Sequence, residues 1–281
     1  MSTLVPSLLA GLIDDATVLP PFSTRVGEAV AAFGKHRTAW YAELLGTMLI
    51  PSTLREITEL SPGLPVGVVN DGPIGSLPAA VARLRETGGV VVRQVEAAVA
   101  HRGEDPQAGL AELRRLTAEH DTQVYAEIPL SWGLLGALDT VAAARDAGQR
   151  LGAKFRVGGL AAELFPTPVE LAAVLCACRD RDLPFKVAAG LRHALRHTDP
   201  ETGFTHHGFL NVLSACLAAV DGAEVADVAE VLAATHPLPL VESARVARDQ
   251  VRPLWVGFST SNVMEPLTEM IRLGLINGGY E

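Results

Sequence analysis

Two lysines lie in short hydrophobic segments that the residue pattern predicts to be β-strands. Lys154 is in the segment AKFRVGG and Lys186 is in the segment PFKVAAG. Because side chains alternate between the two faces of a strand, Lys154 and Arg156 should share the face opposite Phe155. Neighbouring positive charges favour the neutral form of an amine, and a neutral lysine attacks carbonyl groups to form a Schiff base. The two segments therefore predict that Lys154 forms an imine and that Lys186 lowers its pKa.

Acidic residues in other predicted strands could move protons in such a reaction. Glu127 lies in the alternating segment TQVYAEI, Glu96 ends VVRQVE, and Asp14 and Asp15 end the first strand. We assign Glu127, Asp15 and Glu96 to proton transfer, because a carboxylate beside a reacting group can act as a general acid or base. Asp14 is assigned to substrate contact. The alternative is a purely structural network, since buried charges are costly unless they are paired.

A Ser/Thr-rich turn near the end of the chain predicts an anion site. The segment GFSTSN precedes the helical pattern MEPLTEMIRLGLI, and the N–H groups at a helix start bind anions. Gly158 and Gly159 would let a ligand approach the backbone closely. A plain helix cap is the alternative for the turn. We assign phosphate or carboxylate binding to Arg156 and to the four consecutive residues Ser259, Thr260, Ser261 and Asn262.

Four histidines lie close together in the segment LRHALRHTDPETGFTHHG. His193 and His197 are four residues apart, a spacing compatible with a metal on one helix face. The glutamate that follows the first histidine in an HExxH motif is missing, however. We therefore predict no metal and no cofactor, and we assign His193 and His207 to substrate contact.

Eight strand-like segments alternate with amphipathic helical patterns along the chain. The predicted strands are Leu8–Ile13, Leu45–Pro51, Pro65–Asn70, Gly89–Val95, Thr122–Ile128, Ala153–Val157, Pro184–Ala188 and Pro253–Phe258. This number of units in 281 residues is typical of a (β/α)8 or TIM barrel, whose active site lies at the carboxyl ends of its strands. An open doubly wound sheet is the runner-up, but it would call for a GxGxxG motif in the first unit. We predict a single barrel domain over residues 1–281.

The connection between the seventh and eighth predicted strands is unusually long. It runs from Gly190 to Arg252 and contains the histidine segment and the stretch FLNVLSACLAAVDGAEVADVAEVLAA. Long loops inside compact domains are commonly lids or binding loops. We predict a long helical insertion here, in which His193 and His207 close over the bound substrate.

Composition is that of a globular protein and excludes several functional classes. Hydrophobic residues make up 48% of the sequence and charged residues 20%, with a formal net charge of −9. Nucleic acid and anionic membranes are excluded as partners, because both attract clustered basic residues. The sequence has neither an apolar run of transmembrane length nor a signal-peptide pattern at its start. Its three cysteines lack metal or redox spacing, so we expect a cytoplasmic protein.

Several segments together resemble a family of uncharacterised bacterial β/α-barrel proteins. They span nearly the full chain and are LIDDATVLPP, KFRVGG with FPTPVELA, FKVAAGLRHALR, HGFLN and GFSTSNVMEPLTEMIRLGLI. The resemblance implies one barrel domain and a place in the site for Asn211 of HGFLN. The sequence departs from the family pattern at Asp15, at Arg192 and in the turn Gly257–Ser259, which indicates a changed substrate or a specialised pathway.

The two lysines are also similar in arrangement to those of class I aldolases of the deoxyribose-phosphate type. Those barrels carry the imine-forming lysine on strand six and a second lysine on strand seven, where Lys154 and Lys186 are predicted. The similarity implies a carbon–carbon lyase or aldolase acting on a small anionic metabolite that contains a carbonyl group. No nucleic acid or membrane is expected as a partner, whereas the outer helices of a barrel would allow a homo-oligomer.

Other functions fit the same charged residues. One is a metal-dependent hydrolase, isomerase or cyclase that uses Asp14, Asp15, Glu127 and the histidines. Another is a cofactor-free isomerase or cyclase that forms no imine. A third is a catalytically inactive barrel that binds a metabolite.

Overall fold

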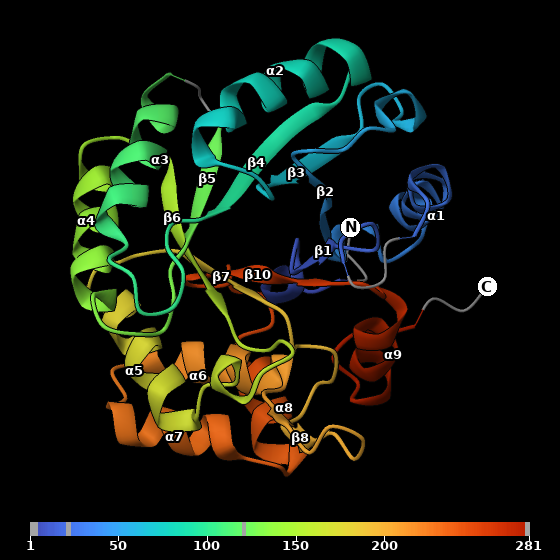
Figure 1. Ribbon diagram of the computed structural model, residues 1–281. Coiled ribbons are helices and arrows are strands. Elements are labelled where there is room, and N and C mark those ends of the chain that lie inside the picture. The colour runs from blue at the N-terminus through green and yellow to red at the C-terminus, as the bar shows by residue number, and fades with distance from the viewer. Residues whose placement is uncertain (1–4, 21–23, 120–121, 279–281) are drawn as a thin grey trace.

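Eight parallel strands close into a barrel with helices around it, as the sequence predicts (Figure 1). The computed structural model describes residues 5–20, 24–119 and 122–278. Around the barrel the strands follow the order β1-β10-β7-β6-β5-β4-β3-β2. They are β1 (Ile13–Asp15), β2 (Leu45–Pro51), β3 (Pro65–Val69), β4 (Val91–Ala98), β5 (Gln123–Glu127), β6 (Leu151–Arg156), β7 (Phe185–Ala188) and β10 (Trp255–Thr260).

The helices of the outer ring follow the strands, with one exception. They are α1 (Val26–Thr38), α2 (Leu77–Gly88), α3 (Gln107–Glu119), α4 (Leu134–Asp146), α5 (Pro168–Arg179), α6 (Phe209–Val220) and α9 (Met264–Arg272). Between β2 and β3, the fully described segment 52–64 forms a short 3₁₀ turn at Ile57–Glu59 instead of an α-helix. The side chains of Ile57 and Leu60 in this segment are buried. The ring of helices is therefore interrupted at this position, while the predicted barrel is confirmed.

The first strand begins later in the chain than predicted. Residues Ser7–Leu9 form a 3₁₀ turn, and β1 covers Ile13–Asp15. Between them Gly11 has a φ of +60°, a left-handed conformation that interrupts an extended run. Both aspartates of the LIDD motif therefore lie within the strand, and the other strands begin and end within a few residues of their predicted bounds.

The long connection between β7 and β10 contains a hairpin and three helices. The hairpin is β8 (His197–Thr198) with β9 (Thr205–His206), and α7 (Val225–Ala233) and α8 (Pro237–Val246) follow α6. Phe209 of α6 stacks on Phe258 of β10 with ring centroids 5.8 Å apart. The predicted helical insertion is confirmed, and α6 serves as the ring helix after β7.

The alternation of side chains along the strands creates two different interiors. The hydrophobic core lies between the strands and the helices and includes Phe33, Phe155, Phe185 and Trp255. Inside the barrel, several charged and polar side chains are buried instead. Among the described residues, no helix combines the length and the apolar character needed to cross a membrane.

Candidate active site

The strand register brings the two lysines side by side inside the barrel. Lys154 on β6 is aligned with Lys186 on β7 and with Glu127 on β5. Phe155 points the other way and packs in the hydrophobic core, as expected from the alternation of side chains. The inward orientation predicted for both lysines is confirmed by the contacts that they make.

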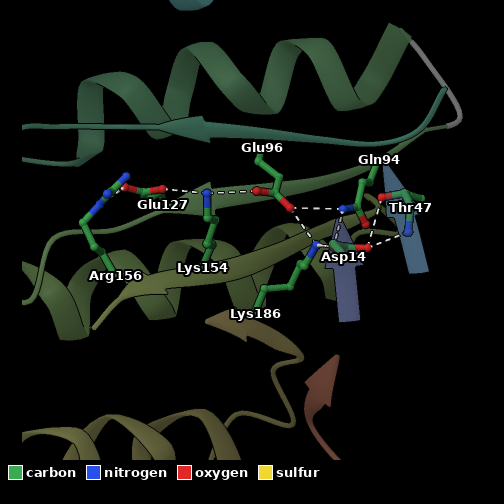
Figure 2. Close-up of polar contacts among 8 residues, drawn as sticks. All are labelled: Asp14, Thr47, Gln94, Glu96, Glu127, Lys154, Arg156 and Lys186. Atoms are coloured by element: carbon green, nitrogen blue, oxygen red, sulfur yellow. Dashed lines mark hydrogen bonds and ion pairs between the residues drawn. The ribbon is translucent and has the colours of Figure 1, made fainter. Parts of the chain in front are cut away.

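Six side chains from five strands form a row of alternating charges, which we call the charge chain (Figure 2). Lys186 Nζ contacts the carboxylate of Asp14 and lies 2.6 Å from Glu96 Oε1. Lys154 Nζ lies 2.9 Å from Glu96 Oε2 and 2.7 Å from Glu127 Oε2. Arg156 Nε lies 3.1 Å from Glu127 Oε1. The row consists of Asp14, Lys186, Glu96, Lys154, Glu127 and Arg156, so its formal charges cancel.

The charge chain runs from the closed interior of the barrel toward solvent. The exposed fraction of the side chain is 1% at Glu96 and 3% at Lys186, but 16% at Glu127 and 46% at Arg156. Arg156 is the last residue of β6, and Glu127 is the last residue of β5. The open end is therefore at the carboxyl ends of the strands, where barrel enzymes build their active sites.

Asp14 anchors the inner end of the charge chain. Its Oδ1 accepts hydrogen bonds from the backbone N–H of Thr47 at 2.6 Å and from the Thr47 hydroxyl at 3.1 Å. Gln94 Nε2 donates to Asp14 Oδ2 at 3.0 Å and to Glu96 Oε1 at 3.1 Å. Gly46 is required beside this carboxylate, because any side chain there would collide with it. Thr47 was not among the predicted site residues. Its position as the single threonine in the hydrophobic strand LGTMLIP is the feature of the sequence that could have identified it.

The alternation of charges determines the protonation state of the two lysines. Burial alone would lower the pKa of Lys154, but the charges of Glu96 and Glu127 outweigh burial and raise it. The pKa of Lys186 is raised in the same way, because the charges of Asp14 and Glu96 outweigh the effect of burial. The prediction that the neighbouring cations depress a lysine pKa is wrong, because a carboxylate stands between each pair of cations. Both lysines are ammonium ions in the resting protein.

The lowered pKa of Glu96 leads us to expect that the protein loses stability in acid. Burial would raise the pKa of Glu96, but Lys154 and Lys186 lower it from 4.5 to about 2. Because the folded pKa is depressed, this carboxylate stabilises the fold fully above pH 4.5 and loses that contribution as the pH falls toward 2. We expect the free energy of unfolding, measured with urea, to decrease across this window. A Glu96→Gln variant should show a flatter pH profile there, and an equally steep profile would contradict the assignment.

A pocket of about 290 Å³ opens where the charge chain reaches solvent. We call it the mouth pocket. Glu127 and Arg156 line it, together with His101, Arg102 and Glu163 from the loops after β4 and β6. His101 and Arg102 were not among the predicted site residues, and their position directly after β4 is the signal that could have identified them.

Asp15 is oriented differently from its neighbour Asp14. The Oδ1 atom of Asp15 accepts hydrogen bonds from the backbone N–H of Thr17, at 2.9 Å, and from the Thr17 hydroxyl. This carboxylate therefore stabilises the loop after β1 rather than joining the charge chain. Of the two aspartates, the structure places Asp14 beside a lysine, so the proton-transfer role predicted for Asp15 has no support from its contacts.

The predicted anion turn bonds largely to itself. Thr260 Oγ1 accepts the N–H of Asn262 at 3.2 Å, and Asn262 Oδ1 accepts the N–H of Met264 at 3.1 Å. The carbonyl oxygen of Ser261 lies 3.4 Å from the hydroxyl of Thr17. The first two are local bonds within the turn, since α9 begins after Val263 without a side-chain cap hydrogen bond, and Ser259 at the end of β10 is half-buried. Anion binding by this turn stays a prediction.

Packing explains the two glycines after β6. A side chain at Gly158 would come within 3.0 Å of the Cα atom of Gly190, and one at Gly159 would collide with Leu164. Close packing of the loops after β6 and β7 therefore favours glycine at Gly158, whereas Gly159 faces mainly the end of the Leu164 side chain. Their predicted contact with a ligand is not tested by this geometry.

His207 and Asn211 hold the insertion together. The ring nitrogen Nε2 of His207 lies 2.8 Å from the carbonyl oxygen of Pro166, and the side chain is 1% exposed. Asn211 is fully buried; its Oδ1 accepts the N–H of Arg196 at 2.8 Å, and its Nδ2 donates to the carbonyl of Ala234 at 2.7 Å. These contacts hold parts of the insertion together, and the substrate contact predicted for the two residues stays a prediction.

Replacing His207 with alanine should destabilise the protein by about 1–3 kcal/mol, the typical cost of a buried polar group left without its partner. Burial lowers the pKa of His207 from 6.5 to about 4, so its contribution to stability is complete above pH 6.5 and is lost as the pH falls toward 4. Urea unfolding at pH 7 and pH 5 tests both points. A His207→Ala variant as stable as the wild type at pH 7 would contradict the structural role.

His193 lies in a separate pocket beside α9. Its Nδ1 is 2.7 Å from Glu269 Oε1, and its ring meets that of His197 edge-on with centroids 4.4 Å apart. The pocket of about 440 Å³ is lined by these residues and by Arg272, not by the charge chain. Substrate contact by His193 therefore stays a prediction.

The described residues contain no cluster of three or more histidine, cysteine, aspartate or glutamate side chains with metal-binding geometry. In that part of the chain, Asp14 and Glu127 contact lysines, and His193 contacts a glutamate. The metal-dependent alternative is therefore left without a ligand set among these residues.

The strand topology defines the fold class, and comparisons with known proteins add nothing narrower. The closed parallel barrel with its ring of helices is a TIM barrel, a fold that commonly carries enzymatic activity at the carboxyl ends of its strands. No family model matches the chain, and neither the curated proteins nor the solved structures provide a match. The resemblance to a bacterial barrel family is supported for the fold alone.

Proposed function

We propose that this barrel is a Schiff-base lyase of the aldolase type, acting on a small anionic metabolite that contains a carbonyl group. The observation that carries the proposal is the position of Lys154. Its Nζ lies between the carboxylates of Glu96 and Glu127, at 2.9 and 2.7 Å, next to the open end of the charge chain. Arg156 supplies a partly exposed cation for the substrate anion at that end.

Lys154 is better placed than Lys186 to be the nucleophile. Lys186 is farther along the charge chain from the mouth pocket, between Asp14 and Glu96, with its Nζ 5.2 Å from the centre of the Tyr125 ring. Lys154 is separated from the mouth pocket by Glu127 alone along the charge chain. Lys186 then keeps Glu96 ionised, so that this carboxylate can receive a proton during turnover.

Substrate binding provides a way to neutralise Lys154. An anionic group that binds Arg156 draws this guanidinium away from Glu127, and the pKa of Glu127 rises as its partner leaves. Glu127 then accepts a proton from the ammonium group of Lys154, 2.7 Å away. The free amine attacks the carbonyl carbon, and the carbonyl oxygen leaves as water after two proton transfers, which produces an iminium ion.

The iminium ion permits cleavage of a carbon–carbon bond. A carboxylate of the charge chain, Glu96 or Glu127, removes the proton of a hydroxyl group on the β-carbon. The electron pair of the carbon–carbon bond moves into the iminium group, and the fragment with the former hydroxyl leaves as an aldehyde or ketone. Protonation of the enamine and hydrolysis by water then release the second product and restore Lys154.

Borohydride reduction followed by mass measurement of the intact protein tests the proposal. The protein is incubated with aldehydes, 2-oxo acids and sugar phosphates, each with and without borohydride. A reduced imine adds the mass of the carbonyl compound less one oxygen atom, and we expect this increase with at least one anionic member. A panel without any borohydride-dependent adduct would contradict Schiff-base chemistry.

A cofactor-free isomerase or cyclase is the second candidate, and the raised pKa of Lys154 favours it. An ammonium group that resists deprotonation can donate a proton to an enolate oxygen, while Glu127 removes a proton from carbon. This enzyme would exchange substrate protons with deuterated water without forming an adduct. A ligand that raises the melting temperature with neither exchange nor adduct would indicate a binding barrel without catalysis.

A further inference from the structure

A second and larger pocket adjoins the mouth pocket on the same face of the barrel. It has a volume of about 530 Å³ and lies among the loops after β4, β5 and β6, at the start of α4 and α5. We call it the rim pocket. Arg102, Leu130 and Glu163 line both pockets. The two pockets therefore lie side by side and share these three residues as walls.

The rim pocket has mostly apolar walls. Trp132, Leu134, Leu135, Pro166 and Val174 are among its lining residues. Trp132 is 63% exposed and Leu135 is 59% exposed. Large apolar side chains that gather at a concave surface indicate a binding function, because leaving them in water is unfavourable.

The walls of the rim pocket are held in place by specific bonds. The indole N–H of Trp132 donates to the carbonyl of Gly103 at 2.9 Å. The Nη1 atom of Arg102 donates to the carbonyl of Glu163 at 3.0 Å, which ties the loop after β4 to the loop after β6. On the other side, the capping box of Thr167 and Glu170 fixes the start of α5. The pocket is therefore largely preformed in the free protein.

The mouth pocket is lined in part by charged side chains and the rim pocket mostly by apolar ones. A ligand that fills both would therefore have a charged end and an apolar end. A carbonyl compound of three or four carbon atoms that reaches Arg156 and Lys154 would occupy the mouth pocket and leave the rim pocket empty. We propose that the substrate carries an apolar tail, aromatic or aliphatic, which lies against Trp132 and Leu135 while its carbonyl and anionic groups face Lys154 and Arg156. This inference rests on the proposed function for the position of the reactive end.

A series of 2-oxo acids of increasing chain length tests the tail. Binding of pyruvate, 2-oxobutanoate, 2-oxopentanoate, 2-oxohexanoate and phenylpyruvate is measured by calorimetry with the full chain. Each buried methylene should tighten binding by about fourfold until the rim pocket is filled, and phenylpyruvate should bind at least ~10-fold more tightly than pyruvate. Equal affinities along the series, or no binding by any member, would overturn the proposal.

Two matched variants locate the effect. Leu135→Asp should abolish the preference for phenylpyruvate over pyruvate, because it places a charge in the apolar wall. Leu238→Asp is the control, since Leu238 is 61% exposed on α8 and lines neither pocket. An unchanged preference in Leu135→Asp, or an equal loss in Leu238→Asp, would contradict the placement of the tail.

A Lys154→Met variant separates this inference from the proposed function. Chain-length dependence that persists in this variant supports the rim pocket even where no imine forms. A borohydride adduct in the wild type, together with equal affinities for all the 2-oxo acids, would overturn the proposed apolar tail of the substrate. It would leave the Schiff-base mechanism in place.

Discussion

Lys154→Met is expected to reduce turnover by at least about 10³-fold, within the range seen when a covalent nucleophile is removed. Methionine keeps most of the volume of the side chain but cannot form an imine. The remaining charges still have partners, because Glu96 stays with Lys186 and Glu127 stays with Arg156. We therefore expect a folded protein with a cooperative thermal transition and no borohydride adduct. Steady-state kinetics and circular dichroism measure the two effects separately.

Lys186→Met is the informative comparison for this variant. Loss of Lys186 removes the partner that contacts Asp14 and one of the two cations beside Glu96. Its effect should be mainly on stability and on the pH dependence of turnover, with adduct formation at Lys154 retained. A folded Lys154→Met protein with the activity of the wild type would contradict the mechanism.

The second large effect is expected from Glu96→Gln, which should lower the free energy of unfolding by about 3–5 kcal/mol, the usual cost of removing one partner from a buried ion pair. Glu96 is 1% exposed and contacts both lysines. Without its charge, two buried ammonium groups remain close together and each loses one compensating carboxylate. Urea denaturation at neutral pH measures the loss.

Glu127→Gln provides the matched control for Glu96→Gln. The Glu127 side chain also contacts Lys154, but it is 16% exposed at the open end of the charge chain. Water can replace part of its interaction there, so the loss of stability should be clearly smaller than for Glu96→Gln. Equal effects of the two substitutions would show that the depth of the charge in the barrel has no energetic consequence.

The inward position of the lysines could be predicted because a strand alternates with a period of two. In KFRVGG and FKVAAG, the aromatic residues mark the face toward the helices, and the charged residues must take the other face. The barrel could be predicted from a different regularity, because eight strand-like segments alternate with helical patterns along the chain. Glu127 and Glu96 were placed near the lysines by this reasoning, and their contacts agree with it.

Alternation does not determine the orientation of Asp14 and Asp15. The strand β1 spans three residues, all buried, so its hydrophobic pattern does not distinguish the inner face from the outer one. The distinction comes from tertiary contacts, namely Lys186 beside Asp14 and Thr17 beside Asp15. The pKa values of the lysines were predicted with the wrong sign for a related reason. Their direction depends on which charge lies between the cations, and strand order alone does not show this.

The insertion shows a further limit of sequence patterns. Its helices could be predicted from hydrophobic periodicity, but the roles of its polar side chains could not. Histidine and asparagine are typical both of substrate contacts and of buried loop anchors. Burial and the carbonyl partners of His207 and Asn211 identify the second role, and both properties exist only in the folded chain.

The location of the reduced adduct tests the central claim most directly. The protein is treated with borohydride and the carbonyl compound that gives the largest mass increase, digested, and its peptides are sequenced by mass spectrometry. We predict modification of Lys154 in wild-type protein and none at that position in Lys154→Met. Modification confined to Lys186 would reverse the roles of the two lysines. An adduct spread over exposed amines, with Lys154 unmodified, would contradict a Schiff-base site at the open end of the charge chain.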